Sequence, residues 1–290
     1  MKIVKLKGGL GNQMFQYTFA KLLEKKTREE IMIDMSYFGD TINDPIRKPR
    51  IQKFSLTLKS PSEEQNQLVL KLTHSGDPLS WKYRLKVMAE SLINKEYCYE
   101  KDRAYINPSD ILNKTYFDGY WQSWRYVDEV KDELKSEFVP KNEVSKKTLE
   151  TMKRVSDENA VFVGVRRGDY SQEEDHYGSF GIKYYLKAMD TIEKEVSSPV
   201  YYIFSNDINW CKVNLDFGNR KVIYREKEDQ VDDFEELLVM SSCKHAIIIN
   251  STYHWWGAEL INNPYKIVVA PKRWFFDEKP IDIVRPEWIK

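Results

Sequence analysis

Short apolar runs alternate with segments of helical periodicity from the first residues of the chain. Residues 2–7 (KIVKLK) predict a strand, residues 14–26 (MFQYTFAKLLEKK) carry apolar side chains at helical spacing, and residues 30–35 (EIMIDM) predict a second strand. The glycine-rich turn GGLGNQ joins the first strand to the helix. The chain therefore opens with a predicted β-α-β unit.

The alternation continues after a less regular stretch. Between Gly39 and Asp118 the pattern blurs, with one mixed helical segment at 79–93, and a clearer helix at 126–138 ends just before Pro140. We place a domain boundary at Pro140. Beyond it the pattern predicts strands at 160–165, 199–205, 221–225, 245–250 and 266–270, and helices at 146–155, 181–196, 208–215, 231–243 and 251–262.

Strands that alternate with helices predict an α/β fold with mostly parallel sheets covered on both faces. The 290 residues have room for two such domains, residues 1–140 and 141–290, and the apolar share of 41% is enough for a core in each. No short internal repeat is present, which sets solenoid folds aside.

The charges balance, with 45 Lys plus Arg and 45 Asp plus Glu. No overall field therefore attracts nucleic acid or an anionic membrane surface, and any anion site must be local. The N-terminus reaches its glycine-rich turn before any apolar run long enough for a signal peptide, and no stretch approaches the roughly 20 apolar residues of a membrane span. We expect a cytoplasmic protein without a membrane span.

The sequence predicts no metal site. Its three cysteines, Cys98, Cys211 and Cys243, are far apart, and its four histidines form neither a His-Glu-x-x-His motif nor a cluster with cysteine. An Asp-x-Asp triplet, with which many sugar-nucleotide enzymes hold Mn²⁺ or Mg²⁺ against a diphosphate, is also missing. We expect reduced packing thiols and a positive charge supplied by arginines and helix N-termini instead.

Four polar turns follow predicted strands, and in parallel sheets ligands bind beyond the carboxyl ends of the strands. The turns are GGLGN, RRGD, SND and NST, and we expect them to converge on one crevice. Their candidate ligand-binding residues are Gly9, Gly11, Asn12, Arg166, Arg167, Ser205, Asn206, Asp207, Asn250, Ser251 and Thr252.

The doubled arginine points to a phosphate. Arg166 and Arg167 follow an apolar strand, where two guanidinium groups are costly unless they meet an anion, and arginine grips phosphate oxygens with two parallel hydrogen bonds. A structural pair with Asp169 is the alternative. The NST turn can cap a helix or donate to a phosphate, and the SND turn can cap a helix or bind a nucleotide.

The GGLGNQ turn is less specific. It fits neither a P-loop nor a full dinucleotide fingerprint, whose third glycine is replaced by Met14. Asp34 nonetheless falls where a ribose-binding acid would lie in a dinucleotide site, so an NAD(P)-dependent oxidoreductase or a sugar-nucleotide epimerase is an alternative function. A tight turn without a ligand is the simpler interpretation.

Four segments resemble the bacterial α-1,2-fucosyltransferases and occur in that family's order: GGLGNQMFQYTFAK, VGVRRGDY, YYIFSNDINWCK and MSSCKHAIIINSTYHWWGAEL. GYWQSWRYVDEV also resembles the family's segment before the linker, and together these segments span residues 1 to about 270. The resemblance implies a GT-B architecture of two Rossmann-like domains. It places GDP-fucose mainly on the second domain and the acceptor mainly on the first.

The resemblance also implies roles and a reaction. By motif, Arg166 and Arg167 hold the diphosphate, Ser251 and Thr252 cap it, Ser205 to Asp207 lie near the nucleotide, and Gly9, Gly11 and Asn12 close the cleft from the first domain. The implied reaction is inverting, metal-independent transfer of fucose from GDP-fucose to the 2-hydroxyl of a galactose. The implied acceptor is a galactose-terminated oligosaccharide or lipid-linked glycan of an O-antigen, capsule or other surface polysaccharide.

Three positions depart from the family's pattern. The family usually has a histidine two residues before the paired arginines, where this chain has Gly164. The usual aspartate pair of the FSDD-type segment reads Asn206-Asp207, and His254 replaces a small residue in the NST segment.

Catalysis also needs a group that removes the acceptor proton. Asp169 and Glu174 are the hypotheses for this base, because they come just after the arginines, and Arg166 acts by stabilising the leaving diphosphate. If neither residue is the base, the acidic segment at 173–176 (EEDH) is expected to be a solvated loop. A glycan-binding module without catalysis is an alternative from a different class, against which the two arginines at a strand end argue.

Overall fold

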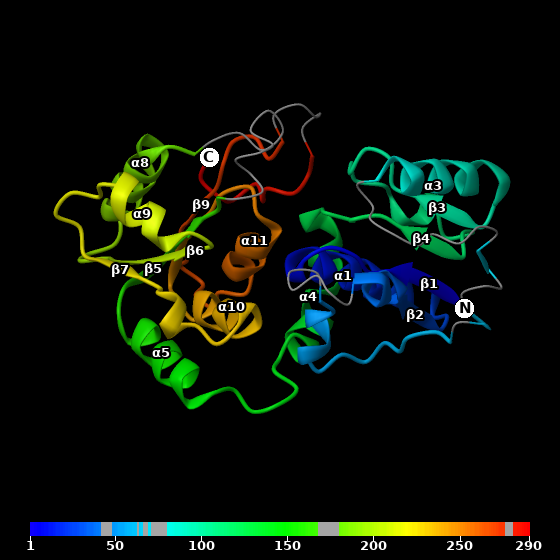
Figure 1. Ribbon diagram of the computed structural model, residues 1–290, viewed down its shortest axis with the longest axis horizontal. Coiled ribbons are helices and arrows are strands. Elements are labelled where there is room, and N and C mark those ends of the chain that lie inside the picture. Colours follow the sequence, from blue (N-terminus) through cyan, green and yellow to red (C-terminus); the bar gives the residue numbers. More distant parts are fainter. Residues whose placement is uncertain (42–47, 63, 66–68, 71–79, 168–179, 276–280) are drawn as a thin grey trace. The chain divides into compact units, whose positions relative to one another are not determined.

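The computed structural model describes residues 1–41, 48–62, 64–65, 69–70, 80–167, 180–275 and 281–290 (Figure 1). It separates into two compact units. Unit 1 comprises Met1–Asn142 with Ile281–Ile283, and unit 2 comprises Glu143–Pro280 with Val284–Lys290. The short segment near the C-terminus joins unit 1 through a hydrogen bond from the N–H of Trp124 to the carbonyl of Asp282 (3.1 Å).

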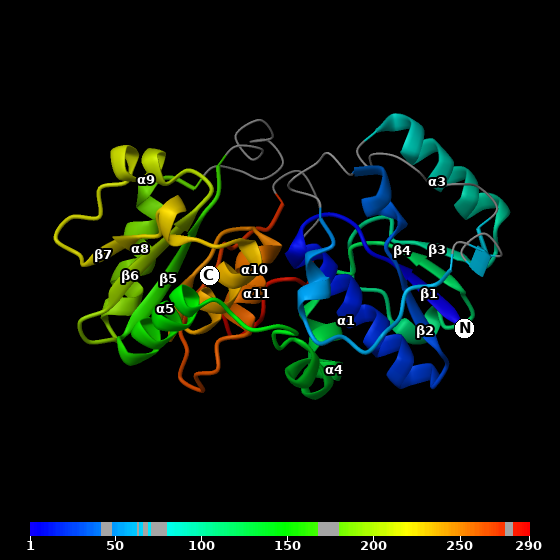
Figure 2. The same cartoon turned by 60° about the horizontal axis from the view of Figure 1, so that its bottom comes forward.

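Unit 1 is built on a four-stranded parallel sheet in the order β2-β1-β4-β3. Its elements are β1 (Lys2–Lys5), α1 (Leu10–Thr27), β2 (Ile31–Asp34), α3 (Trp81–Ile93), β3 (Tyr97–Tyr99), β4 (Tyr116–Asp118) and α4 (Trp124–Glu137), with 3-10 helices at Ser36–Thr41, Arg50–Lys53 and Pro108–Asp110. The helices α1 and α4 pack together on one face of the sheet, and α3 covers the other face (Figure 2).

Unit 2 is built on a five-stranded parallel sheet in the order β7-β6-β5-β8-β9. Its elements are α5 (Lys146–Asp157), β5 (Ala160–Val165), α8 (Ile182–Glu193), β6 (Val200–Ser205), α9 (Ile208–Asn214), β7 (Val222–Tyr224), α10 (Asp233–Ser241), β8 (His245–Ile247), α11 (Thr252–Glu259) and β9 (Val268–Val269), with a 3-10 helix at Lys227–Asp229. Successive strands run from β5 outward to β7 and then return to the other side of β5. The strand order therefore reverses between β5 and β8, which is where sheets of this kind bind ligands.

Helices cover both faces of the central strand of unit 2. All six residues of β5 are buried. Val161, Val163 and Val165 pack in the cluster that includes side chains of α8 and α9, while Phe162 faces Gly257 of α11 on the opposite side. This explains why β5 is apolar at every position instead of alternating.

The parallel α/β class predicted from the sequence is confirmed, and the strands and helices of unit 2 occur where the pattern placed them. The strands β3 and β4, in the irregular stretch that ends at Asp118, were not predicted. Both lie among polar and charged residues, so neither forms an apolar run like the one that marks the equally short strand β8.

Candidate functional site

Three of the four polar turns lie at the carboxyl edge of the unit 2 sheet. Arg166 and Arg167 follow β5, the SND turn ends β6, and the NST turn leads from β8 into α11. Because β5 and β8 are paired neighbours on either side of the reversal in strand order, the two arginines and the start of α11 lie at the switch point. The fourth turn, GGLGN, follows β1 and so belongs to the sheet of unit 1.

Arg167 is held from two sides. Its N–H donates to Oδ1 of Asn206 (2.8 Å), and Nδ2 of Asn206 donates to its carbonyl (3.0 Å), so the Asn206 amide extends the pairing of β5 with β6 by one step. The guanidinium carbon of Arg167 lies 4.2 Å from the ring centroid of Trp210 in α9. A cation–π contact orients the charged end of a long side chain. Trp210 could not be identified from the sequence, because its place beside Arg167 depends on how β5 and β6 pair.

The SND turn caps a helix. Oδ1 of Asp207 accepts from the N–H of Trp210 (3.0 Å) as the N-cap of α9, and Oγ of Ser205 accepts from the N–H of Asp207 (3.0 Å). Capping is one of the two roles that the sequence left open for these residues, and a contact with a nucleotide stays a prediction.

The NST turn places a helix N-terminus beside the arginines. Nδ2 of Asn250 donates to the carbonyl of Trp274 (2.8 Å) and ties the turn to the segment that follows β9. Ser251 is the N-cap residue of α11, but its side chain makes no capping hydrogen bond, and Thr252 is the first helical residue. The partial positive charge of this helix end adds to the attraction of the arginines for an anion.

A buried histidine lies directly against β5. A Cβ atom at Gly164 would lie 2.4 Å from Nδ1 and 2.6 Å from Cγ of His254, so the imidazole of α11 fills the space where a side chain at position 164 would begin. Burial, and secondly the Arg166 cation, lowers the pKa of His254 to about 3, which keeps the ring neutral. Its Nδ1 has no hydrogen-bond partner among the residues that the structure describes.

The glycine-rich turn of unit 1 requires glycine at one position. Gly8 has a φ of +78°, and a Cβ there would lie 2.7 Å from Nδ2 of Asn12. Gly9 is the N-cap residue of α1, and Gly11 and Asn12 lie in its first turn. Oδ1 of Asn12 accepts from Nε2 of Gln122 (2.9 Å), which follows β4. The turn is thus tied across the two central strands of the unit 1 sheet.

Asp34 has a structural role in unit 1. Its carboxylate accepts from the N–H and the hydroxyl of Ser36 (2.8 and 3.1 Å) and from the hydroxyl of Tyr116, and the residue is 1% exposed. A ribose would need an accessible carboxylate, so the interpretation of Asp34 as a ribose-binding acid is wrong. This removes the main support for a dinucleotide enzyme.

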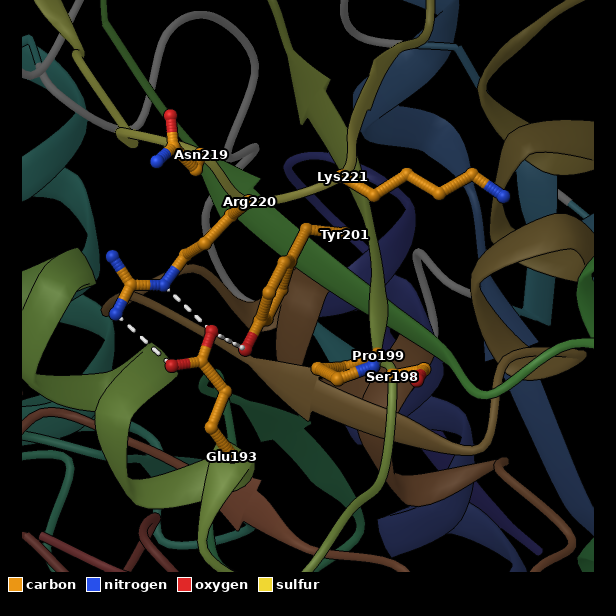
Figure 3. Close-up of a pocket in the computed structure, with 7 residues that line it drawn as sticks. All are labelled: Glu193, Ser198, Pro199, Tyr201, Asn219, Arg220 and Lys221. Carbon is orange, nitrogen blue, oxygen red and sulfur yellow. Dashed lines mark hydrogen bonds and ion pairs between the residues drawn. The ribbon is translucent and has the colours of Figure 1, made fainter.

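A pocket of about 470 Å³ lies at the other end of the unit 2 sheet. Figure 3 shows Glu193, Tyr201 and Arg220 pointing toward one another there. Arg220 donates through Nε to Glu193 (2.6 Å), and the hydroxyl of Tyr201 donates to the same carboxylate (3.1 Å). These groups satisfy one another at the amino ends of β6 and β7, away from the edge where parallel sheets bind ligands, so we do not assign the active site to this pocket.

Both candidate bases, Asp169 and Glu174, lie outside the described residues. Within the described part of the chain, no three His, Cys, Asp or Glu side chains gather in a way that could hold a metal ion. Cys98, Cys211 and Cys243 are buried free thiols, as predicted. None of the helices described is long and apolar enough to cross a membrane.

The whole chain matches one known sequence family. The family described as Glycosyl transferase family 11 covers residues 1–290. The chain belongs to glycosyl transferase family 11. It is therefore a glycosyltransferase, and the resemblance noted from its motifs is confirmed.

Similar proteins come from bacteria and primates. The chain is 30% identical to the O-antigen biosynthesis glycosyltransferase WbnK and 29% identical to an alpha-1,2-colitosyltransferase, both from Escherichia coli. The first match covers 98% of each chain, and the second covers 99% of this chain and 98% of the relative. Galactoside alpha-(1,2)-fucosyltransferase 1 of Ateles belzebuth is 25% identical over 59% of this chain and 50% of its own length.

Solved structures share the fold. A mutant of Arabidopsis thaliana FUT1 in complex with GDP has a TM-score of 0.50 at 13% identity, and covers 93% of this chain and 71% of its own. The alpha-1,6-fucosyltransferase NodZ, soaked with GDP-fucose, has a TM-score of 0.50 at 11% identity, with coverage of 92% and 94%. This family 11 chain therefore has the GT-B fold that the family resemblance implied.

The contact between Gly164 and His254 connects two departures from the family's usual pattern. This family 11 member lacks a histidine at position 164 of β5 and has one at position 254 of α11 instead of a small residue. Since the imidazole of His254 occupies the space next to Gly164, the two changes compensate each other sterically. An imidazole therefore still lies between β5 and α11, but α11 supplies it instead of β5.

Proposed function

We propose that this family 11 enzyme transfers L-fucose from GDP-β-L-fucose to the 2-hydroxyl of a terminal galactose, with inversion at the anomeric carbon. The observation that carries the proposal is the pair of guanidinium groups of Arg166 and Arg167 at the switch point, beside the start of α11. Unit 2 binds the donor and unit 1 the acceptor, which is a galactose-terminated oligosaccharide or lipid-linked glycan used in surface polysaccharide synthesis.

In the proposed reaction the two arginines stabilise the leaving diphosphate. As the bond between the anomeric carbon and the diphosphate oxygen breaks, negative charge grows on the leaving diphosphate and positive charge on the sugar ring. Arg167 is already oriented by Asn206 and Trp210, so it can stabilise the diphosphate without reorganising. Arg166 and the N-terminus of α11 add positive charge at the same edge of the sheet. In this scheme a divalent cation is not needed.

The acceptor hydroxyl gives its proton to a carboxylate, for which Asp169 and Glu174 are the candidates. We expect the amide variant of the true base, Asp169→Asn or Glu174→Gln, to lose turnover by at least about a hundredfold. GDP should bind to it as to the parent, because the base does not contact the nucleotide. A variant that turns over at the parent's rate removes its residue from consideration.

The names of the relatives support a sugar-nucleotide donor and a glycan acceptor, but they differ in the transferred sugar. One E. coli relative is named for colitose, and the primate relatives are named for fucose. NodZ was solved with GDP-fucose and Arabidopsis FUT1 with GDP. The donor therefore has to be tested directly.

A donor screen tests the proposal. We expect GDP at a hundred times its Kd to raise the melting temperature by about 5 °C or more, because a ligand that binds only the folded state stabilises it by mass action, whereas NAD should have no effect. Of GDP-fucose, GDP-colitose, GDP-mannose and UDP-galactose, GDP-fucose should give the highest kcat/KM with lactose as the acceptor. The product should carry an α-1,2 linkage by NMR.

The alternatives predict different results. Stabilisation by NAD and not by GDP would contradict a GDP-sugar as the donor. Binding of galactosides without any transfer or hydrolysis of a GDP-sugar would contradict the proposed reaction. Preference for GDP-colitose over GDP-fucose would keep the mechanism and contradict the proposed sugar.

A further inference from the structure

The helix α3 of unit 1 buries one face and leaves the opposite face bare. Tyr83 and Val87 point into the cluster over the sheet, and the hydroxyl of Tyr83 donates to the carboxylate of Asp118 (3.1 Å). Glu90 is fully buried on the same side. These contacts fix the helix rotation and therefore determine which side chains face outward.

The outward face of α3 is an apolar stripe, formed by Trp81, Leu85, Met88 and Leu92. Their exposed fractions are 67%, 54%, 57% and 84%. The spacings of four, three and four residues place them in one row along the helix, opposite the buried face. With Ile93, α3 carries five of the twelve exposed large apolar residues among those that the structure describes. Single apolar residues scattered over a protein surface are common, but five on one 13-residue helix form a patch of the kind that marks an interaction site.

Basic residues flank the stripe on both sides. At 100° per residue, Arg84 lies on one side of the stripe and Lys82 on the other, while Lys86 lies beyond Lys82 toward the buried face. All three are exposed, and Nζ of Lys82 lies 5.8 Å from the centroid of the Trp81 ring. The acidic residue of α3, Glu90, is on the buried side, so the outward face carries positive charge alone.

We propose that α3 docks unit 1 on an anionic phospholipid bilayer, with the apolar stripe in the headgroup–acyl boundary and the flanking basic residues at the phosphates. A helix with Trp and Leu on one side and Lys and Arg beside them lies in the plane of such an interface. Each basic residue near an anionic surface strengthens binding about fivefold. The attraction is local, which is compatible with the balanced charge of the whole chain.

The charges also favour a bilayer over a second copy of this chain. If two α3 helices paired through their stripes, the basic residues of both would gather along the same seam and repel one another. An anionic surface instead meets the flanking basic residues with opposite charge. The proposal concerns where the enzyme works and does not depend on which sugar it transfers.

Vesicle co-sedimentation of the full chain tests the proposal. We expect binding to phosphatidylcholine vesicles that contain 30% phosphatidylglycerol, much weaker binding to phosphatidylcholine alone, and loss of binding as NaCl rises from 0.1 to 0.5 M, because salt screens the basic residues. Leu85→Glu should weaken binding at least about tenfold, because it places a charge where the proposed apolar side chain enters the bilayer. Lys82→Gln with Arg84→Gln should weaken it about twenty-fivefold, on the anionic vesicles alone.

A control variant tests whether vesicle binding requires the apolar stripe of α3 or any exposed apolar residue. Leu149 of α5 is 51% exposed, close to the 54% of Leu85, and Leu149→Glu should bind vesicles like the parent. Both variants should keep the parent's melting temperature, since each changes an exposed residue. Three outcomes overturn the proposal: a parent that does not sediment with the anionic vesicles, equal losses for the two glutamate variants, or a parent dimer that Leu85→Glu dissociates without any vesicle binding by either protein.

Discussion

Alanine in place of Arg166 or Arg167 is expected to lower kcat with the GDP-sugar on the order of a hundredfold in each case. The positive charge of each side chain stabilises the negative charge that develops on the leaving diphosphate in the transition state. Removing one preorganised hydrogen-bond donor of this kind lowers kcat by about that factor. Both residues are only half-buried, so the variants should fold. The measurement is steady-state kinetics with a GDP-sugar, together with the melting temperature.

Two further variants sharpen this test. Arg167→Lys keeps the charge but loses the planar fork, so it should recover only part of the rate. Arg154→Ala removes an exposed arginine of α5 in the same unit and should leave kcat unchanged. If the alanine variants of Arg166 and Arg167 fold and turn over at the parent's rate, the assignment of this site must be abandoned.

Gly164→Ala is expected to destabilise unit 2 by about 2 kcal/mol and to lower its melting temperature by about 5 °C. The added methyl carbon would lie 2.4 Å from Nδ1 of His254, well inside van der Waals contact. The imidazole cannot easily retreat, because His254 is 4% exposed and lies against the ring of Phe162. Denaturant unfolding monitored by circular dichroism measures the change.

The second half of this prediction is a rescue. In a His254→Ala background the space beside β5 is open, so adding Gly164→Ala should then have almost no further effect on stability. The exchange variant, Gly164→His with His254→Ala, returns the imidazole to the family's usual position and should be more stable than Gly164→His alone. Additive effects of the Gly164→Ala and His254→Ala changes in the double-mutant cycle would show that the two positions are not coupled.

Much of the fold could be predicted from periodicity. The β-α-β unit at the start of the chain and the strands and helices from Ala160 onward bury apolar residues whose spacing is visible in the sequence. The strands β3 and β4 could not be predicted, because they lack an apolar run and owe their place to pairing, β4 with β1 and β3 with β4. The role of Asp34 was misassigned because position alone does not show whether a carboxylate is already occupied by neighbours such as Tyr116.

The fold class and the positions of the polar turns could be inferred from the order of the amino acids, and the family from the resemblance of its motifs, because each depends on neighbouring residues. How those turns work depends on tertiary contacts. Only the pairing of β5 with β6 brings Asn206 and Trp210 to Arg167, and only the packing of α11 on β5 brings His254 to Gly164. These contacts join residues far apart in the chain, and a local pattern carries no information about which distant side chain will fill a given space.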